Sequence, residues 1–280
     1  MRIVGLGNAL TDVLARLHSD ECFDEMGLLK GGMQLIDEEK LLRIMSVFEG
    51  LETTLASGGS AANAVSGVAR MGIESGFIGK IGRDAYGRFF REDMERNGVQ
   101  TLLIEGEQAS GCAMTMITPD GERTFGTFLG AAATLCAEEL SAEMFEGYDI
   151  LHIEGYLVQD TSLILRAVQL AKEAGLSVSF DMASYNVVKD NYAIIRDLVE
   201  NYVDILFANE EEALAYTGEE PRKATEILSR YCRIAVVKCG AQGSFVGREG
   251  IITEVPATPE VRVDSTGAGD LYASGLEFNL

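Results

Sequence analysis

Residues 149–180 read DILHIEGYLVQDTSLILRAVQLAKEAGLSVSF. This segment predicts a strand at 149–153, a helix at 161–174 and a second strand at 177–180. The same alternation continues with strands at 204–207 and 234–238 and with helices at 192–202, 210–217 and 222–231. Strands separated by helices indicate βαβ units, so we predict an α/β protein with a mainly parallel central sheet flanked by helices.

The first half of the chain predicts a second, smaller sheet. Residues 111–117 and 123–129 flank Pro119-Asp120-Gly121-Glu122, a strong signal for a hairpin turn. Small and polar residues alternate along these strands, as in a sheet with one exposed face. We therefore divide the chain into a core and a β lid. The core comprises residues 1–12, 38–98 and 130–280, and the lid comprises residues 13–37 and 99–129.

The composition excludes several classes of protein. With 280 residues, 47% of them hydrophobic, and only four prolines, the chain can bury a large core. A formal net charge of −21 argues against nucleic acid as a partner, because phosphate contacts need clustered Lys and Arg. Five cysteines without C-x-x-C spacing indicate reduced thiols in a cytoplasmic protein. We find neither a signal-peptide apolar region nor an apolar run long enough to cross a membrane.

Polar residues follow several of the predicted strands. Asp12 follows the first strand, and Glu154, Asp181 and Asn209 follow three later ones. Open α/β sheets bind ligands beyond the carboxyl ends of their strands, so we expect a site at this edge. For each residue taken alone, turn capping or a structural role is the alternative.

A glycine-containing segment, Gly58-Gly59-Ser60-Ala61-Ala62-Asn63, opens a helix of small residues. It would let a ligand approach the backbone closely, with Asn63 about one turn into the helix. The structural alternative is a tight turn and a helix packed through its alanines. A nucleophile elbow is excluded because it needs glycine where Ala62 stands.

A second such segment, residues 264–270 (DSTGAGD), leads from a β-branched run into an expected helix. Small residues at a helix start leave backbone N–H groups exposed, and these suit a phosphate or a developing anion. Asp270 would lie beside that anion, where a carboxylate can take a proton from a hydroxyl during phosphoryl transfer. Taken alone, the segment is equally consistent with a turn whose aspartate favours the helix dipole.

Two further motifs lie between these segments. Asn209 and Glu212 share one face of a starting helix and could hold a hydrated Mg²⁺, or could instead cap that helix. Lys238, Gly240 and Gly243 follow a strand in a form that lets phosphates approach the backbone, although Lys238 could equally be a solvated lysine.

In this order, the four motifs resemble those of the ribokinase-like (PfkB) carbohydrate and nucleoside kinases. Residues 58–63 and 264–270 are similar to the two signatures of that family, and Asn209-x-x-Glu212 and Lys238-x-Gly240-x-x-Gly243 to two inner motifs. The resemblance covers nearly the whole chain. It implies a three-layer ribokinase-like fold, with a small β-sheet lid over the sugar site.

The resemblance also implies a role for each motif. Asp270 would be the base that deprotonates the acceptor hydroxyl, and the amides of Gly267, Ala268 and Gly269 would form the anion hole. The remaining residues fall into three groups: Asp12, Gly58, Gly59, Asn63 and Glu154 for the acceptor; Asn209 and Glu212 for Mg²⁺ and its waters; and Lys238, Gly240, Gly243, Asp264 and Thr266 for the nucleotide.

The expected activity is ATP-dependent transfer of the γ-phosphoryl group to a primary hydroxyl of a sugar or nucleoside. ATP and Mg²⁺ are the implied cofactors, with a monovalent cation as an additional candidate and a homodimer through the lid as a candidate assembly. Residues 7–12 and 30–37 look more like the adenosine-kinase-like branch than like ribokinase proper.

Family members usually continue for some tens of residues past the last motif, through a helix that lines the adenine pocket. The resemblance therefore implies that the chain is short at its C-terminal end. On that account, the alternative function is a sugar- or nucleoside-binding protein of the same fold with weak or no catalysis.

Overall fold

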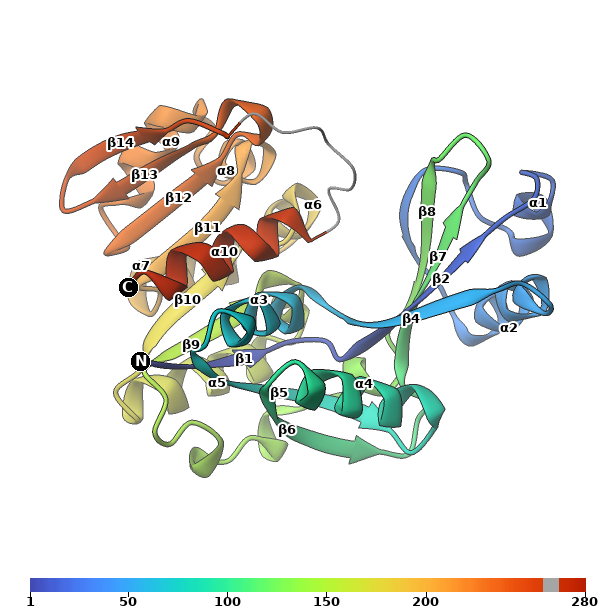
Figure 1. Ribbon diagram of the computed structural model, residues 1–280. Helices are drawn as coiled ribbons and strands as arrows, with labels where there is room; N and C mark the ends of the chain where they lie inside the picture. The colour runs from blue at the N-terminus through green and yellow to red at the C-terminus, as the bar shows by residue number, and fades with distance from the viewer. Residues whose placement is uncertain (259–266) are drawn as a thin grey trace.

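The computed structural model of the protein describes residues 1–258 and 267–280, which contain two β-sheets (Figure 1). Within these residues, the large sheet has nine strands in the order β14 (Ile251–Val255), β13 (Ser244–Arg248), β12 (Ile234–Lys238), β11 (Ile205–Asn209), β10 (Ser177–Asp181), β9 (Ile150–Glu154), β1 (Arg2–Leu6), β5 (Glu74–Gly82) and β6 (Val99–Gly106). The small sheet of the same part of the chain has five, in the order β3 (Gly32–Leu35), β8 (Arg123–Phe128), β7 (Gly111–Ile117), β2 (Leu10–Arg16) and β4 (Thr53–Gly58).

Helices connect most of these strands. The α-helices are α1 (Cys22–Met26), α2 (Glu38–Phe48), α3 (Ser60–Arg70), α4 (Ala85–Arg96), α5 (Thr161–Glu173), α6 (Tyr185–Asp190), α7 (Tyr192–Asn201), α8 (Glu210–Thr217), α9 (Pro221–Leu228) and α10 (Ala268–Phe278). Short 3₁₀ helices are η1 (Gly130–Thr134), η2 (Ala137–Glu139), η3 (Ala142–Met144), η4 (Gly155–Gln159) and η5 (Gly240–Gln242). No helix of the described residues is long and apolar enough to span a bilayer.

The strands of the large sheet from β6 to β12 pair in parallel, and only β13 and β14 run antiparallel to their neighbours. Parallel neighbours need crossover connections, and the helices provide them. The carboxyl ends of these strands therefore meet at one edge of the sheet, where the sequence predicts a site.

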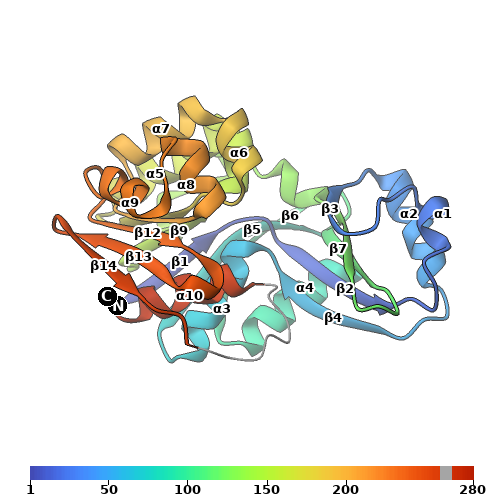
Figure 2. The same cartoon turned by 90° about the horizontal axis from the view of Figure 1, so that it is seen from above.

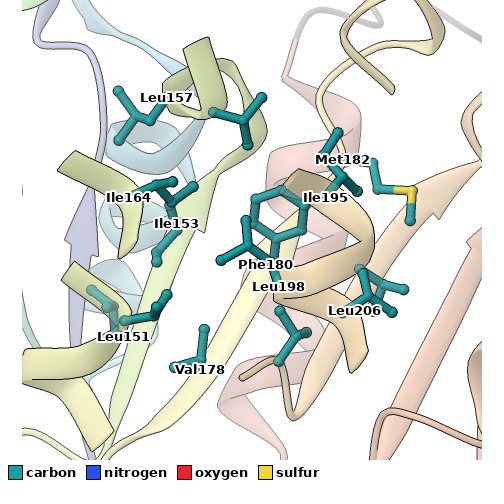
Figure 3. Close-up of a cluster of buried hydrophobic side chains, with 14 of the residues drawn as sticks. Leu151, Ile153, Leu157, Ile164, Val178, Phe180, Met182, Ile195, Leu198 and Leu206 are labelled. Carbon is teal, nitrogen blue, oxygen red and sulfur yellow. The ribbon is translucent and has the colours of Figure 1, made fainter. Parts of the chain in front are cut away.

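Both faces of the large sheet are covered. Leu151 and Ile153 of β9 join one buried cluster, which also contains Phe180 of β10 and residues of α5 and α7 (Figure 3). Ile150, which alternates with them along the strand, joins a second cluster with Phe77 and residues of α3, α4 and α10. The view in Figure 2 shows the sheet between these two helical layers, so the predicted three-layer α/β architecture is confirmed.

The small sheet projects from the core and carries α1 and α2 on one face (Figures 1 and 2). Val13 and Met114 pack there against Phe23 of α1 and against Ile44 and Phe48 of α2. Asp37 caps α2, because its side chain accepts a hydrogen bond from the Lys40 amide. The small sheet is therefore a lid with a core of its own.

The boundary between lid and core differs from our division of the chain in three places. Residues 38–48, assigned to the core, form α2, whose Ile44 and Phe48 pack on the lid. Residues 99–106, assigned to the lid, form β6, which pairs in parallel with β5 in the large sheet. Residues 53–58, assigned to the core, form β4, which pairs antiparallel with β2 in the lid. Residues 99–106 follow α4 and complete a βαβ unit with β5, whereas residues 53–58 carry too few apolar side chains to reveal the lid strand.

Candidate active site

A cleft of about 980 Å³ lies where the carboxyl ends of the core strands meet the lid. Met33 and Phe125 line it from the lid, and the first turn of α10 lines it from the core. Its charged residues come from strand ends and helix starts far apart in the sequence: Asp12, Asp181, Glu210, Glu211, Glu212, Lys238 and Asp270. The predicted edge of the sheet is therefore a solvent-accessible site rich in carboxylates.

Asp270 lies in the first turn of α10 and is held by α3. The Ser60 hydroxyl donates a 2.8 Å hydrogen bond to its Oδ1, and the Asn63 amide donates a 2.9 Å bond to its Oδ2. Burial raises the pKa of Asp270 above its ordinary value, against the opposing effect of these two bonds. The two glycine-containing segments of the sequence thus meet at this carboxylate.

The start of α10 combines backbone donors with a lysine. Gly267 has a φ of 70° and caps the helix, which leaves the N–H groups of its first turn at the cleft. The ammonium group of Lys238 lies beside this turn, since a Cβ added to Gly269 would be 3.1 Å from its Nζ. The Asp181 carboxylate accepts a 2.8 Å bond from the same Nζ. Lys238 is therefore held within the site rather than in solvent.

Asp12 lies on β2, where β2 leaves the core for the lid. Burial, together with the charge of Asp270, raises the pKa of Asp12 to about 6. Gly58 packs directly against its carboxylate, because any Cβ there would overlap the carboxylate oxygens. Gly59 has a φ of 101° and passes so close to the Asn8 carbonyl that a side chain would collide with it. Both glycines thus bring backbone and carboxylate together at the lid junction.

Glu154, at the end of β9, contacts the protein with both of its oxygens. Oε1 accepts hydrogen bonds from the backbone and side-chain amides of Asn8, and Oε2 accepts one from the Ala61 amide. Only 1% of the residue is exposed. These contacts support the structural alternative, in which Glu154 ties β1 to the start of α3.

Asn209 and Glu212 form a capping box at the start of α8. Glu212 Oε2 accepts from the Asn209 amide, Oε1 accepts from its Nδ2, and Asn209 Oδ1 accepts from the Glu212 amide. The structural alternative of the sequence is therefore present. Glu212 nonetheless lines the cleft, and burial followed by the charge of Asp181 raises its pKa to about 7.

This arrangement fits a hydrated Mg²⁺ better than a directly bound one. Each oxygen of Glu212 already accepts one hydrogen bond, and its remaining lone pairs could receive metal-bound waters. Burial raises the pKa of both Asp12 and Glu212, and a cation bound nearby would favour the charged form of each carboxylate. Among the described residues, no group of three or more His, Cys, Asp or Glu side chains forms a metal cluster.

The remaining predicted nucleotide residues lie at the opposite end of the cleft from the lid. Gly240 and Gly243 line it, and an added Cβ at Gly240 would meet open space. Asp264 and Thr266 lie outside the described residues. The structure therefore brings together, around one cleft, every predicted site residue that it describes except Gly58 and Glu154. Gly58 packs against the Asp12 carboxylate, and Glu154 is hydrogen-bonded to Asn8 and Ala61.

Two contacts and one residue of the site were not predicted from the sequence. Ser60 lies inside a quoted motif, yet its bond to Asp270 depends on the packing of α3 against α10. Asp181 was noted at a strand end, but its pairing with Lys238 required the sheet order. Tyr156 lines the cleft from η4, and no sequence signal marked it.

A second hollow of about 540 Å³ adjoins the lid end of the cleft and shares Met33, Gly59, Ser60 and Tyr156 with it. Its further lining includes the apolar side chains of Leu10, Leu35, Leu129, Leu135, Leu157 and Val187. A ligand held beside Asp270 could therefore extend into an apolar space under the lid.

Comparisons with known proteins agree with this geometry. Residues 26–280 match the model of the pfkB family carbohydrate kinases. An uncharacterized sugar kinase of Archaeoglobus fulgidus is 30% identical over 76% of this chain and 85% of its own, and a fructokinase of Klebsiella pneumoniae is 29% identical over 78% and 75%. The crystal structure of adenosine kinase from Sinorhizobium meliloti superposes with a TM-score of 0.85 at 32% identity, covering 99% of this chain and 86% of that one.

The fold and these comparisons place the protein in the class of small-molecule kinases. The chain belongs to the pfkB family of carbohydrate kinases and is a sugar or nucleoside kinase. The family resemblance of the sequence and the ribokinase-like fold are thereby confirmed.

Proposed function

We propose that the protein transfers the γ-phosphoryl group of ATP to a primary hydroxyl of a sugar or nucleoside, with Asp270 as the general base. One observation carries this proposal. The carboxylate of Asp270 lies in the first turn of α10, beside the N–H groups at the start of that helix, and is fixed through both oxygens by Ser60 and Asn63. A base and an anion-binding helix start thus occupy the same turn.

The proton transfer needs a carboxylate with room for a further hydrogen bond. A carboxylate offers about four lone-pair positions, and Ser60 and Asn63 occupy two of those on Asp270. The acceptor hydroxyl could donate to another. The raised pKa of Asp270 makes it a better proton acceptor near neutral pH than an exposed aspartate.

The transferring group would meet positive charge on two sides. Gly267, Ala268 and Gly269 line the cleft at the positive end of the helix dipole, and Lys238 adds an ammonium group beside them. Asp181 holds Lys238 in place and raises the pKa of its amine, although burial opposes the charged form. Positioning and charge stabilisation of this kind are what phosphoryl transfer requires.

The cleft has distinct places for its two substrates. Asp12 and Asn63 lie at the lid end, where hydroxyl groups of the acceptor would bind, and Gly240 and Gly243 lie at the other end for the nucleotide. Asn209 and Glu212 would hold Mg²⁺ through waters. When bound, the ion would neutralise charge on the phosphate oxygens. A monovalent cation and a cytoplasmic location stay predictions.

The apolar hollow beside the acceptor end favours a nucleoside over a small sugar. Sugar hydroxyls would occupy the polar region near Asp12, and a flat heterocyclic base would fit the space bordered by Leu135, Leu157 and Val187. This is the same distinction that residues 7–12 and 30–37 indicate in the sequence.

An ATP-consumption screen tests the proposal. Ribose, fructose, 2-keto-3-deoxygluconate, adenosine and inosine are offered with Mg-ATP, and ³¹P NMR of the product locates the new phosphate ester. We expect turnover with a nucleoside and a phosphate on its primary hydroxyl. ATP turnover with none of these acceptors, together with measurable nucleoside binding, would instead establish the non-catalytic binding protein.

A further inference from the structure

Three polar side chains that the proposed reaction does not use lie buried beneath the cleft. His152 of β9, Ser179 of β10 and Glu277 of α10 are 1%, 0% and 0% exposed. His152 Nδ1 lies 2.8 Å from Glu277 Oε1, and the Ser179 hydroxyl donates a 2.5 Å hydrogen bond to the same oxygen. The cluster therefore joins two core strands to one helix.

That helix is the one that carries Asp270. Glu277 follows Asp270 by seven residues, about two helical turns, so both side chains share the face of α10 that packs on the sheet. At the other end of the contact, His152 precedes Glu154 by two residues on β9, and Ser179 precedes Asp181 by two on β10. The cluster thus lies on the same sheet face as the site residues, one step deeper in the core.

The cluster contains a buried carboxylate, that of Glu277, whose charge needs compensation. Glu277 Oε2 is the one buried side-chain polar atom without a hydrogen-bond partner among residues 1–258 and 267–280. A buried carboxylate with an unpartnered oxygen needs a compensating charge, and the imidazole of His152 is the titratable group that contacts it.

We infer that Ser179, His152 and Glu277 form a buried latch that holds the C-terminal half of α10 on the sheet and thereby positions Asp270 at the other end of the helix. Ser274, between the two, adds a 2.8 Å hydrogen bond to the Ala64 carbonyl of α3. The helix is then fixed against α3 in its middle and against β9 and β10 at its end. The inference rests on Asp270 being the catalytic base.

The charges around His152 determine the pH range in which it is protonated and paired with Glu277. Burial disfavours its charged form, but the Glu277 carboxylate, together with the charges of Asp181 and Asp270, raises the pKa of His152 above its ordinary value. Glu154 shares its strand face, whereas α3 and β11 present apolar side chains such as Phe207. The ion pair is complete below the ordinary pKa of histidine and is lost as pH rises through the raised value.

The chain offers a direct probe, because His18 and His152 are its only histidines. A ¹H–¹³C NMR titration of the imidazole signals, assigned with His18→Gln, follows His152 in the unmodified protein. We expect His152 to stay charged above the ordinary histidine pKa, and kcat to fall on the alkaline side over the same pH range. Titration of His152 at or below its ordinary value would overturn the latch without any variant at its own residues.

Glu277→Gln removes the charge and keeps the shape. We expect a lower titration midpoint for His152, faster hydrogen–deuterium exchange at residues 268–272, and a kcat about 10- to 100-fold lower with both KM values within about twofold. Glu92→Gln, an exposed change of the same kind on α4, is the matched control and should leave all four readouts unchanged.

The outcomes separate the two proposals. Turnover of no acceptor contradicts the proposed function alone, because the titration and the exchange measurements do not need catalysis. Unaltered exchange or unaltered kcat in Glu277→Gln contradicts the latch alone. If Glu277→Gln does not fold, the match between the His152 titration and the alkaline fall of kcat in the unmodified protein decides, and a mismatch overturns the inference.

Discussion

Asp270 concentrates the proposed chemistry in one carboxylate, and Asp270→Asn tests it most directly. The asparagine keeps the side-chain shape but cannot take the proton, so we expect turnover to fall by roughly 10²- to 10⁴-fold. The acceptor dissociation constant should change little, because Asp12 and the lid still hold the acceptor. Steady-state kinetics and calorimetric binding measure the two effects. Near-normal turnover in the folded variant would remove Asp270 from the role of base.

The buried carboxylate of Asp12 is expected to lower folding stability at neutral pH although it is proposed to bind the acceptor. Its pKa is raised from 3.8 to about 6 by burial and by Asp270, so the folded state binds a proton more tightly than the unfolded state. Folding stability due to Asp12 therefore falls as pH rises from about 4 to about 6. Asp12→Asn should remove this loss and raise the free energy of unfolding at pH 7 by about 1–3 kcal/mol.

Urea unfolding between pH 4 and pH 7 measures this effect. The difference between Asp12→Asn and the unmodified protein should grow with pH and level off above about 6. The acceptor KM should rise at the same time, since the variant lacks the carboxylate at the lid junction. If Asp12→Asn were less stable than the parent protein at pH 7, the idea that the charged Asp12 carboxylate lowers folding stability would be refuted.

At the scale of elements, the contact between α3 and α10 assembles the site. Ser60→Ala deletes one of the two bonds to Asp270 and leaves the other, so kcat should fall about tenfold, less than in Asp270→Asn. Ser66→Ala is the matched control, because Ser66 lies on the same helix and contacts Met94 rather than Asp270. Steady-state kinetics compare them.

A double mutant tests whether Ser60 acts through Asp270. If it does, adding Ser60→Ala to Asp270→Asn should change kcat very little, since the bond no longer supports a base. Equal losses in the presence and in the absence of the Asp270 carboxylate would show that Ser60 acts on the acceptor or on folding instead.

The elements also show what a sequence can reveal. The βαβ rhythm after residue 149 predicts the parallel sheet because each strand and helix has a local pattern. The lid strand at 53–58 has no such pattern and is defined by its pairing with β2. Likewise, Asn63 could be picked from its motif, but its bond to Asp270 depends on a contact across 207 residues. Pairings of this length follow from packing, which local patterns do not encode.

For the whole molecule, the lid is the part expected to move. It has its own buried core, and one of its faces overlies the cleft through Met33 and Phe125. The chain contains no tryptophan, so a single Trp introduced by Phe125→Trp would report on the lid alone. We expect its fluorescence to shift when the acceptor binds, because closure would remove the ring from water.

Tyr231→Trp supplies the control for that measurement. Tyr231 is exposed and follows α9, away from the lid, so its reporter should respond little to the acceptor. Equal responses from both reporters would point to a change throughout the molecule rather than to lid closure. A homodimer through the lid stays a prediction, and since α1 and α2 cover the other face, such a dimer would use an edge strand of the lid, β3 or β4.

The path of the chain, which alternates between core and lid, has a consequence for how the lid can move. The backbone passes between the two sheets four times: after β1, after β4, after β6 and after β8. Four backbone connections restrict the motion of the lid relative to the core more than a single connection would. We therefore expect the lid to close by a restricted hinge motion that returns Met33 and Phe125 to the same place over the acceptor in each catalytic cycle.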